Sequence, residues 1–332
     1  MAERLVPAIS LRDFENRKQE IISQLVDAAE NSGFLTLVDH GITVEEIEAQ
    51  FALSKTFFGL SLETKHATKF DSSTSLGFEY KSQKRATTGV DQKESLLIQP
   101  NHHNYWPRDE DVPNFKATTE LFLAKCATIS QQVLQCFAIA LGFQEDYFRA
   151  PMDALSPDSL NQLRFLHYFP SEKQAQEPGT NTFGAGTHTD FGCLTLLFQQ
   201  SGGDGLEICP GRESHTSGAL GDTFFPIPAN TGPIVVNIGD MLMSWSDDRF
   251  KATFHRVCSP KGKSPDRYSI AYFNQGRDNF MFQGPLKKYE PVTCGDYVHR
   301  KLASFFKLTG KDKKNSVVEQ TRELPALVAA AT

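Results

Sequence analysis

The spacing of apolar residues predicts two long amphipathic helices in the first half of the chain. One apolar stripe repeats near the i, i+3, i+4 and i+7 positions of a helix face and comprises Ile21, Ile22, Leu25, Val26 and Ala29. A second stripe runs along residues 115–142 and ends at Gly142, a residue type that often follows the last turn of a helix. Over residues 12–65 the same periodicity predicts helices around one pair of strands. We expect these helices to pack on the outside of a β core.

Later in the chain, the pattern changes from helical to β. From residue 161 to residue 285, short β-rich runs alternate with turns that contain glycine or proline. Many short strands of this kind favour a double-sheet jelly roll of the cupin type. The predicted fold class is therefore mainly β with α, with a double-stranded β-helix core flanked by N-terminal and C-terminal helices.

These patterns divide the chain into three parts. Residues 1–150 are expected to form a helical and β region packed on the core, residues 151–308 the jelly roll with a C-terminal helix, and residues 309–332 a peripheral tail. Within the core, residues 209–231 are rich in glycine, proline and serine, and we interpret them as a long loop. That loop either overhangs a pocket or forms a mobile surface insertion.

Composition and charge limit the classes of function. The 332 residues are 39% hydrophobic, which is enough for a sizeable core, and the net charge of −6 offers no basic surface for nucleic acid. No apolar run of about 18 residues and no secretory signal pattern occurs. The six cysteines form no CxxC pair, so we expect reduced, structural thiols. We therefore expect a cytoplasmic protein, monomeric or weakly homo-oligomeric, that acts on a small molecule and binds neither nucleic acid nor membrane.

Three residues have the identities and order of a metal site. His188 and Asp190 are separated by one residue, and residues i and i+2 of a strand point to the same side, about 6.6 Å apart. They can approach one ion together, and a third ligand must come from another strand. His255 lies in residues 250–257, which have strand character. Two histidines and one carboxylate occupy one face of a metal and leave the other open, as in non-haem Fe(II) oxygenases.

Arg267 and Ser269 form a candidate anion site. They are again i and i+2, so their side chains are expected to face the same interior, together with Phe273. A guanidinium buried in a barrel costs several kcal/mol unless an anion pairs with it. Arginine pairs with a carboxylate through two parallel hydrogen bonds, and a serine hydroxyl can add a third. On a neighbouring segment, Arg164 and Tyr168 share one face, and Arg164 would sense the polarity of a substrate if that face is turned inward.

In order and context, these motifs resemble one enzyme family. His188-Thr189-Asp190 is followed by an apolar run, by a strand that ends at Gly239-Asp240, by His255 and by Arg267-Tyr268-Ser269. Upstream, the run from Ser32 contains Asp39, where the family usually has asparagine. Over residues 5–308 the sequence resembles the 2-oxoglutarate/Fe(II)-dependent dioxygenases of the isopenicillin N synthase-like superfamily.

The resemblance implies cofactors and a reaction. Fe(II) would be held by the catalytic triad of two histidines and one aspartate. The far carboxylate of 2-oxoglutarate would be held by Arg267 and Ser269, with Tyr168 beside them. With O2, such an enzyme oxidises a small organic metabolite by hydroxylation, desaturation or rearrangement, and it releases succinate and CO2. We expect this reaction in the biosynthesis of a secondary metabolite.

Within the family, the segments around Arg164 and Arg267 look most like fungal thymine 7-hydroxylase and related biosynthetic dioxygenases. There a flat ring is held between aromatic side chains and hydrogen-bonded by an arginine, which carries over to Phe191, Phe273 and Arg164. Phe191 stands where we expect tyrosine, and residues 209–231 are a further departure. We therefore expect a different small metabolite as substrate, either aromatic or carboxylated.

Several alternatives use the same residues. An isopenicillin N synthase-like oxidase would keep the iron and use Arg267 and Ser269 for a substrate carboxylate, without 2-oxoglutarate. A pyrimidine-base hydroxylase would keep both iron and 2-oxoglutarate. A non-catalytic jelly-roll binding protein, or a zinc hydrolase with metal-bound water, would use the triad differently. Succinate formation coupled to loss of substrate separates the 2-oxoglutarate-dependent enzymes from the others.

Overall fold

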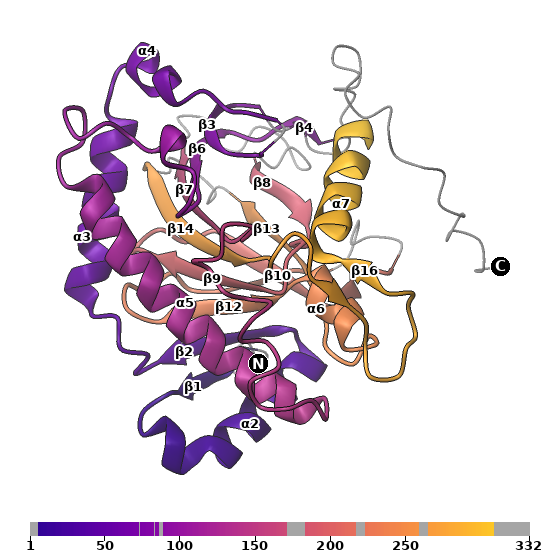
Figure 1. Cartoon of the computed structure of the whole chain (residues 1–332). Coiled ribbons are helices and arrows are strands. Elements are labelled where there is room, and N and C mark those ends of the chain that lie inside the picture. The colour runs from indigo at the N-terminus through magenta and orange to yellow at the C-terminus, as the bar shows by residue number, and fades with distance from the viewer. Residues whose placement is uncertain are drawn as a thin grey trace.

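Two β-sheets form the centre of the molecule (Figure 1). The computed structural model describes residues 6–308 except residues 73, 83, 86–88, 171–182, 217–222 and 259–264. The larger sheet contains, in spatial order, β1 (Ala8–Ser10), β2 (Phe34–Val38), β12 (Ile234–Ile238), β9 (Leu194–Gln199), β14 (Arg267–Asn274), β7 (Gln162–Tyr168), β6 (Lys93–Ile98) and β3 (Gly77–Tyr80). The smaller sheet contains β11 (Phe225–Pro226), β10 (Leu206–Glu213), β13 (Thr253–Cys258) and β8 (Phe183–His188).

The two sheets enclose a hydrophobic interior of their own. Side chains alternate along a strand. Leu163 and Phe165 of β7 accordingly belong to the large core on the helix side of the sheet. Leu166 and Tyr168 of the same strand belong to a second cluster, which they share with Ile208 of the smaller sheet. Two stacked, mainly antiparallel sheets with this interior confirm the predicted jelly roll.

Helices cover the outer side of the larger sheet. They are α2 (Phe14–Asn31), α3 (Val44–Phe58) and α5 (Phe115–Ala140). The predicted apolar stripe on α2 is confirmed, since its buried positions include Ile21, Leu25 and Ala29. The second predicted helix is confirmed as α5, and Gly142 follows it with a φ of 80°. These helices pack their buried faces into the same core as the outward side chains of the sheet.

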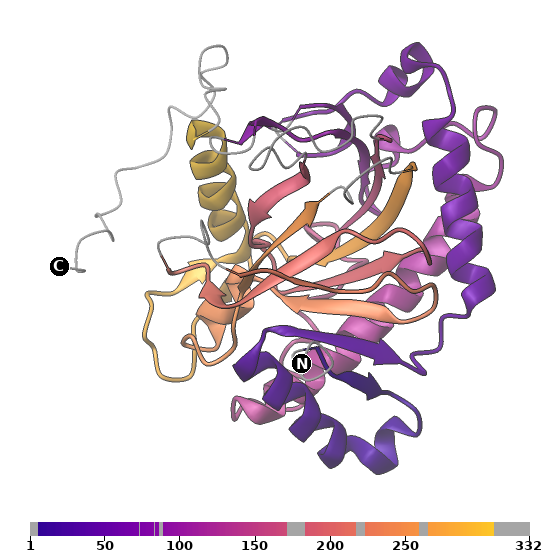
Figure 2. The same ribbon diagram turned by 180° about the vertical axis from the view of Figure 1, so that it is seen from behind.

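Shorter elements complete the fold. They are α4 (Leu62–Lys65), the 3-10 helices η1 (His66–Thr68) and η2 (His103–Tyr105), β4 (Lys84–Arg85), β5 (Gly89–Val90), α6 (Asp240–Trp245), β15 (Met281–Phe282), β16 (Val292–Thr293) and α7 (Cys294–Leu308). Helix α7 stands on the opposite side of the strands from α3, as two opposite views of the molecule agree (Figures 1 and 2).

The N-terminal region supplies both ends of the larger sheet. Strands β1 and β2 lie at one end of that sheet, and β6 and β3 lie at the other. Strands β12, β9, β14 and β7, which occur later in the sequence, lie between them. Residues before position 150 therefore provide four of the eight strands.

The expected loop over residues 209–231 is wrong at its beginning. Strand β10 continues to Glu213, and Cys209 is buried. Gly211 has a φ of 84°, and the pairing of β10 with β13 shifts register between Ile208 and Glu213. Proline and glycine here belong to a β-bulge, which accommodates both residue types within a strand. Of the remainder, residues 217–222 lie outside the described part of the chain, as does the expected tail at residues 309–332.

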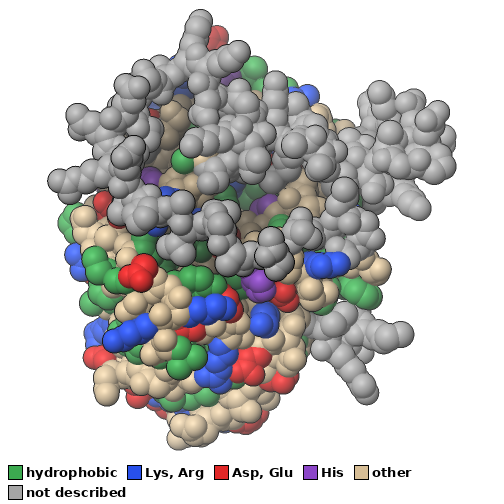
Figure 3. Space-filling view, turned by 90° about the vertical axis from the view of Figure 1, so that its right-hand side faces the viewer, with side chains coloured by type: hydrophobic (Ala, Val, Ile, Leu, Met, Phe, Trp, Pro, Cys, Tyr) green, Lys and Arg blue, Asp and Glu red, His purple; other side chains and the backbone are tan. Residues whose placement is uncertain are grey.

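The surface carries charges of both signs. On the face in Figure 3, acidic and basic side chains are interspersed over the described residues, which agrees with the small net charge of −6. No helix among the described residues has the length and apolar character that a membrane crossing requires.

Gly33 offers a test of how tightly the helices and strands join. Its φ is 66°, and an added Cβ would lie 1.9 Å from the carbonyl oxygen of Lys251. Gly41 has a similar φ of 86° but an added Cβ there would meet nothing within 4 Å. We expect Gly41→Ala to cost about 1 kcal/mol, from backbone strain alone, and Gly33→Ala to cost about 3 kcal/mol or more, because the backbone must also move. Urea denaturation of the two variants checks this, and equal losses would contradict it.

Candidate metal centre and anion site

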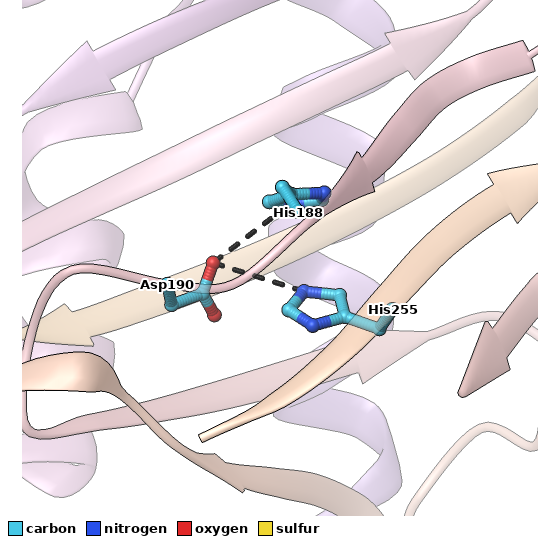
Figure 4. Close-up of side chains that lie close together, drawn as sticks. All are labelled: His188, Asp190 and His255. Carbon is cyan, nitrogen blue, oxygen red and sulfur yellow. Dashed lines mark ion pairs between the residues drawn. The ribbon is translucent and has the colours of Figure 1, made fainter. Parts of the chain in front are cut away.

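Two histidines and one aspartate converge beside strands β8 and β13 (Figure 4). His188 is the last residue of β8, and His255 lies opposite it in β13. The Oδ1 atom of Asp190 lies 3.8 Å from Nε2 of His188 and 3.7 Å from Nε2 of His255. The three ligand atoms all lie within 4.8 Å of one another. Atoms at these separations can share one ion with bonds of about 2.1 Å.

Asp190 reaches this position in a way that strand alternation did not predict. Strand β8 ends two residues earlier, so Asp190 belongs to the following turn. Its carboxylate is fixed from the larger sheet, because the Thr195 hydroxyl and the Asn237 amide donate hydrogen bonds of 2.6 and 2.8 Å to Oδ2. Its carbonyl oxygen accepts a 2.7 Å bond from the backbone N–H of Asp240. Oδ2 is thereby satisfied, and Oδ1 is left facing the two imidazoles.

The turn that carries Asp190 packs directly against the start of α6. A Cβ on Gly239 would lie 2.1 Å from the carbonyl oxygen of Gly192, so only glycine allows this approach. The next residue, Asp240, is buried, and its Oδ2 forms a 2.7 Å ion pair with Lys301 of α7. The C-terminal helix is thus tied to the turn through one buried carboxylate.

Hydrogen bonds from the other ring nitrogen orient both histidines. Nδ1 of His188 lies 2.8 Å from the carbonyl oxygen of Gly186, and Nδ1 of His255 lies 3.2 Å from that of Thr253. A carbonyl oxygen can only accept, so each Nδ1 carries the proton and each Nε2 presents a lone pair toward Asp190. This is the tautomer that a metal ligand needs. The donor set of two imidazoles and one carboxylate therefore fits a divalent metal such as iron.

A buried ion pair supports β8 from behind the metal ligands. Asp91 accepts a 3.1 Å hydrogen bond from the backbone N–H of Gly186, and it forms a 2.9 Å ion pair with Lys93. Both charged residues are almost fully buried, with 2% and 5% of their surface exposed. Since the carbonyl of Gly186 orients His188, the N-terminal region helps to set the position of a candidate metal ligand.

Arg267 is buried without a counter-ion among the described residues. It is 7% exposed, and its Nε and Nη2 donate to the Gly203 carbonyl at 2.7 Å and to the Gln199 side chain at 3.0 Å. Its Nη1 and the hydroxyl of Ser269, which is 1% exposed, have no hydrogen-bond partner. The guanidinium lies over the ring of Tyr168, 4.6 Å from its centroid. A buried cation with a free N–H and a free hydroxyl beside it fits a small carboxylate.

The remaining predicted residues lie on or near the same interior. Arg164 is on the inward side of β7, where Nη2 forms a 2.9 Å ion pair with Glu79 and a 2.9 Å hydrogen bond to Ser95. Phe273 is half-buried against the interior cluster. Phe191 is half-buried and directly follows Asp190, the candidate metal ligand.

The cysteines stay apart from the metal cluster. All six are free, and Cys193, which follows Asp190 closely in the sequence, is completely buried. Burial raises the pKa of the Cys193 thiol well above its usual range, so it remains a neutral apolar side chain.

Sequence reasoning missed the side chains that hold the ligands in place. Asn237 carried a usable signal, because a polar residue interrupts the apolar run of β12 on its inward side, next to Val235. Asp91 carried none, since its partner Gly186 lies 95 residues away in the sequence.

Two family models match the chain. Residues 160–276 match the model of the 2OG-Fe(II) oxygenase superfamily, and residues 6–117 match the N-terminal model described as non-haem dioxygenase in morphine synthesis. The first match contains all three metal-ligand candidates and Arg267, and the second contains the N-terminal strands that complete the larger sheet.

Individual proteins that are similar to this chain agree with the family models. The 2-oxoglutarate-Fe(II) type oxidoreductase ppzD of Metarhizium rileyi is 32% identical, covering 84% of each chain. The proline hydroxylase buaE of Petromyces alliaceus is 32% identical, covering 82% of this chain and 86% of the relative. The crystal structure of Neurospora crassa thymine 7-hydroxylase in complex with alpha-KG has a TM-score of 0.77 and 30% identity, covering 90% of this chain and 96% of that chain.

The site, the fold and the relatives lead to the same group of enzymes. The donor set fits iron, the buried arginine and serine fit a carboxylate, and a structural neighbour binds alpha-KG. The chain belongs to the 2OG-Fe(II) oxygenase superfamily, whose members need Fe(II), 2-oxoglutarate and O2.

Proposed function

We propose that this dioxygenase hydroxylates a small, uncharged organic metabolite beside an Fe(II) ion held by His188, Asp190 and His255. The reaction consumes the substrate R–H, 2-oxoglutarate and O2, and it releases R–OH, succinate and CO2. One oxygen atom of O2 enters the product and the other enters succinate. The supporting observation is that three convergent metal-ligand atoms share an interior with a buried guanidinium that no carboxylate of the described residues neutralises.

Arg267 and Ser269 have the properties of a cosubstrate site. The far carboxylate of 2-oxoglutarate accepts hydrogen bonds from the unpartnered Nη1 and the unpartnered hydroxyl. The anion also supplies the counter-charge that the buried guanidinium lacks, which offsets the cost of burying both charges. The ring of Tyr168 packs against the guanidinium. When bound, iron and 2-oxoglutarate together supply the oxidation of a C–H bond, and the protein's part is to orient both against the substrate.

The electrostatic environment of Arg164 is the opposite of that of Arg267, and this difference indicates the charge of the substrate. Its charge is already compensated by Glu79, while its Nε is buried without a hydrogen-bond partner. A compensated guanidinium favours a neutral acceptor, such as a carbonyl or amide oxygen, over a second carboxylate. We therefore assign Arg164 to a substrate carbonyl and the half-buried Phe191 and Phe273 to the substrate's apolar part.

The range of relatives supports a specialised substrate. The Neurospora crassa enzyme has been crystallised with thymine, while buaE is named a proline hydroxylase, so enzymes of similar sequence act on different molecules. The thymine complex keeps a pyrimidine base as an alternative substrate, because thymine is small, flat and uncharged and bears carbonyl groups. Other relatives are fungal dioxygenases with separate names, which supports a step in secondary-metabolite biosynthesis.

Arg267→Ala tests the cosubstrate assignment. Loss of the guanidinium removes charge-assisted hydrogen bonds worth about 1.5–3 kcal/mol each, so we expect the Kd for 2-oxoglutarate to rise at least about 10- to 100-fold. Iron binding should stay within about twofold. Anaerobic titration of the Fe(II) protein with 2-oxoglutarate, followed by the weak visible charge-transfer band, measures this Kd. Arg277→Ala, which removes an arginine just beyond the other end of β14, is the matched control. An unchanged affinity in Arg267→Ala would reject the assignment.

His255→Ala should remove iron and cosubstrate binding together. Only two ligands of the triad remain, and the Nε2 lone pair that faces Asp190 is lost. Loss of a hydrogen-bond partner outside the ligand set typically lowers metal affinity by roughly 10- to 100-fold. Loss of a direct ligand should lower metal affinity by more than that. Metal analysis after anaerobic loading and desalting measures the iron content. Retention of one iron per chain in this variant would show that the metal lies elsewhere.

Glu79→Gln tests the class of substrate. It leaves Arg164 without its counter-charge, so the site should become more favourable for an anion. We expect the wild-type enzyme to oxidise uncharged carbonyl compounds rather than the matched carboxylic acids. In the variant, the ratio of acid oxidation to amide oxidation should rise by at least about tenfold, which corresponds to about 1.4 kcal/mol. Mass spectrometry with ¹⁸O₂ and pairs of amides and acids measures the ratio. A wild-type enzyme that oxidises only the acids would contradict the assignment.

A further inference from the structure

A chain of four ionisable side chains lies on the outer face of the larger sheet. His167 of β7 is at its centre, with Nδ1 2.8 Å from Glu94 of β6 and Nε2 2.7 Å from Asp266, the residue before β14. Glu94 also forms a 2.8 Å ion pair with Lys65 of α4, which in turn donates to the backbone carbonyl of Phe58 at 2.9 Å. The cluster therefore joins two N-terminal helices, strands β6 and β7 and the start of β14.

The geometry defines the hydrogen bonds of the imidazole. Both ring nitrogens face carboxylate oxygens, which only accept when they are ionised. Both contacts are therefore made only when His167 carries a proton on each nitrogen. With one proton fewer, one carboxylate loses its donor. Glu94 is 2% exposed and keeps Lys65, whereas Asp266 is 51% exposed, so the contact to Asp266 is the weaker of the two.

Aromatic packing completes the surroundings of His167. Its ring stacks on Tyr268 with centroids 4.6 Å apart and an angle of 6° between the planes. The ammonium of Lys55, from α3, lies 5.5 Å from the centre of the Tyr268 ring. Burial and the nearby carboxylates of Asp266 and Glu94 raise the pKa of Tyr268, so its hydroxyl stays neutral.

Two members of this outer cluster are next to residues of the proposed cosubstrate site. His167 precedes Tyr168, and Asp266 precedes Arg267. Arg267 lies opposite Tyr168 in the pairing of β14 with β7, and its guanidinium lies over the Tyr168 ring on the inner face. Successive residues of a strand point to opposite faces. The same two backbone segments thus carry an ion pair outside and the Arg267–Tyr168 contact inside.

The start of β14 depends on this support more than the rest of the strand does. From Ser269 onward β14 pairs with β7 on one side and with β9 on the other. At Arg267 and Tyr268, within the described residues, it pairs with β7 alone. An ion pair between His167 and Asp266 spans the β7–β14 seam where the strand has one partner.

We propose that His167 and Asp266 are positioning residues for the cosubstrate, holding the first residue of β14 so that Arg267 presents its free N–H to the far carboxylate of 2-oxoglutarate. The proposal rests on the role of Arg267 given above. It assigns to the N-terminal helices, through Lys65 and Glu94, a part in cosubstrate binding at a distance from the cosubstrate itself.

The test compares 2-oxoglutarate affinity with iron affinity in the full-length Fe(II) protein. His167→Phe keeps an aromatic ring against Tyr268 and removes both hydrogen bonds, while Asp266→Ala removes the exposed partner with little risk to folding. We expect each to raise the Kd for 2-oxoglutarate about five- to tenfold, with iron binding within twofold of the wild type. Asp266→Asn keeps an acceptor oxygen, so its Kd for 2-oxoglutarate should lie within about threefold of the wild-type value. These Kd values come from anaerobic titration of the visible band, below the denaturation temperature of each variant.

A double variant and a control separate positioning from general stability. Both substitutions break the same contact, so their effects should not add. The Kd of the double variant for 2-oxoglutarate should be at most about twofold above the higher Kd of the two single variants. Arg277→Gln breaks the Arg277–Asp158 pair just past the other end of β14 and should leave the Kd unchanged. Unchanged Kd values in both His167→Phe and Asp266→Ala, alongside a raised Kd in Arg267→Ala, would overturn the positioning role alone. An unchanged Kd in Arg267→Ala would overturn the cosubstrate site and this proposal together.

Discussion

The way in which Asp190 is held governs the whole site. The two histidines come from the smaller sheet, and their mutual position follows from the pairing of β8 with β13. Asp190 lies beyond the end of β8, and its carboxylate is fixed by Thr195 and Asn237 of the larger sheet. The ligand set is therefore complete only where the two sheets meet. Close packing in the jelly roll resists relative movement of the sheets, and that resistance keeps three ligand atoms together.

The interior of the jelly roll distinguishes two arginines by their counter-charges. Arg164 is paired with Glu79, and Lys93 nearby is paired with Asp91. Within the described residues, the acceptors of Arg267 are neutral and come from Gly203 and Gln199. Since an unpaired buried charge is costly, a ligand anion contributes most beside Arg267, which no carboxylate neutralises in the described part of the chain. The placement of the protein's own carboxylates can thus determine at which buried cation a small diacid binds.

The sequence predicted what depends on residue identity and strand alternation. The convergence of the three metal-ligand candidates, the shared inward face of Arg267 and Ser269, the two long helices and the jelly roll all follow from spacing and order. Alternation could not predict that Asp190 lies in a turn, because the hydrogen bonds that hold it come from β9 and β12. Nor could it predict the partners of Arg164, since Glu79 lies 85 residues away. Pro210 and Gly211 suggested a loop because a bulge and a turn use the same residue types.

The arrangement of the larger sheet constrains the order in which the chain can fold. Its edges are made by strands from the first hundred residues, and its centre is made by strands between residues 162 and 274. A two-stranded piece such as β1–β2 or β3–β6 is marginal on its own in water. During synthesis these early strands must wait for the central ones, and long-range pairing of this kind is slow. Until it occurs, their apolar faces are open to other chains, so the nascent enzyme passes through a period of exposure to aggregation that the finished fold does not reveal.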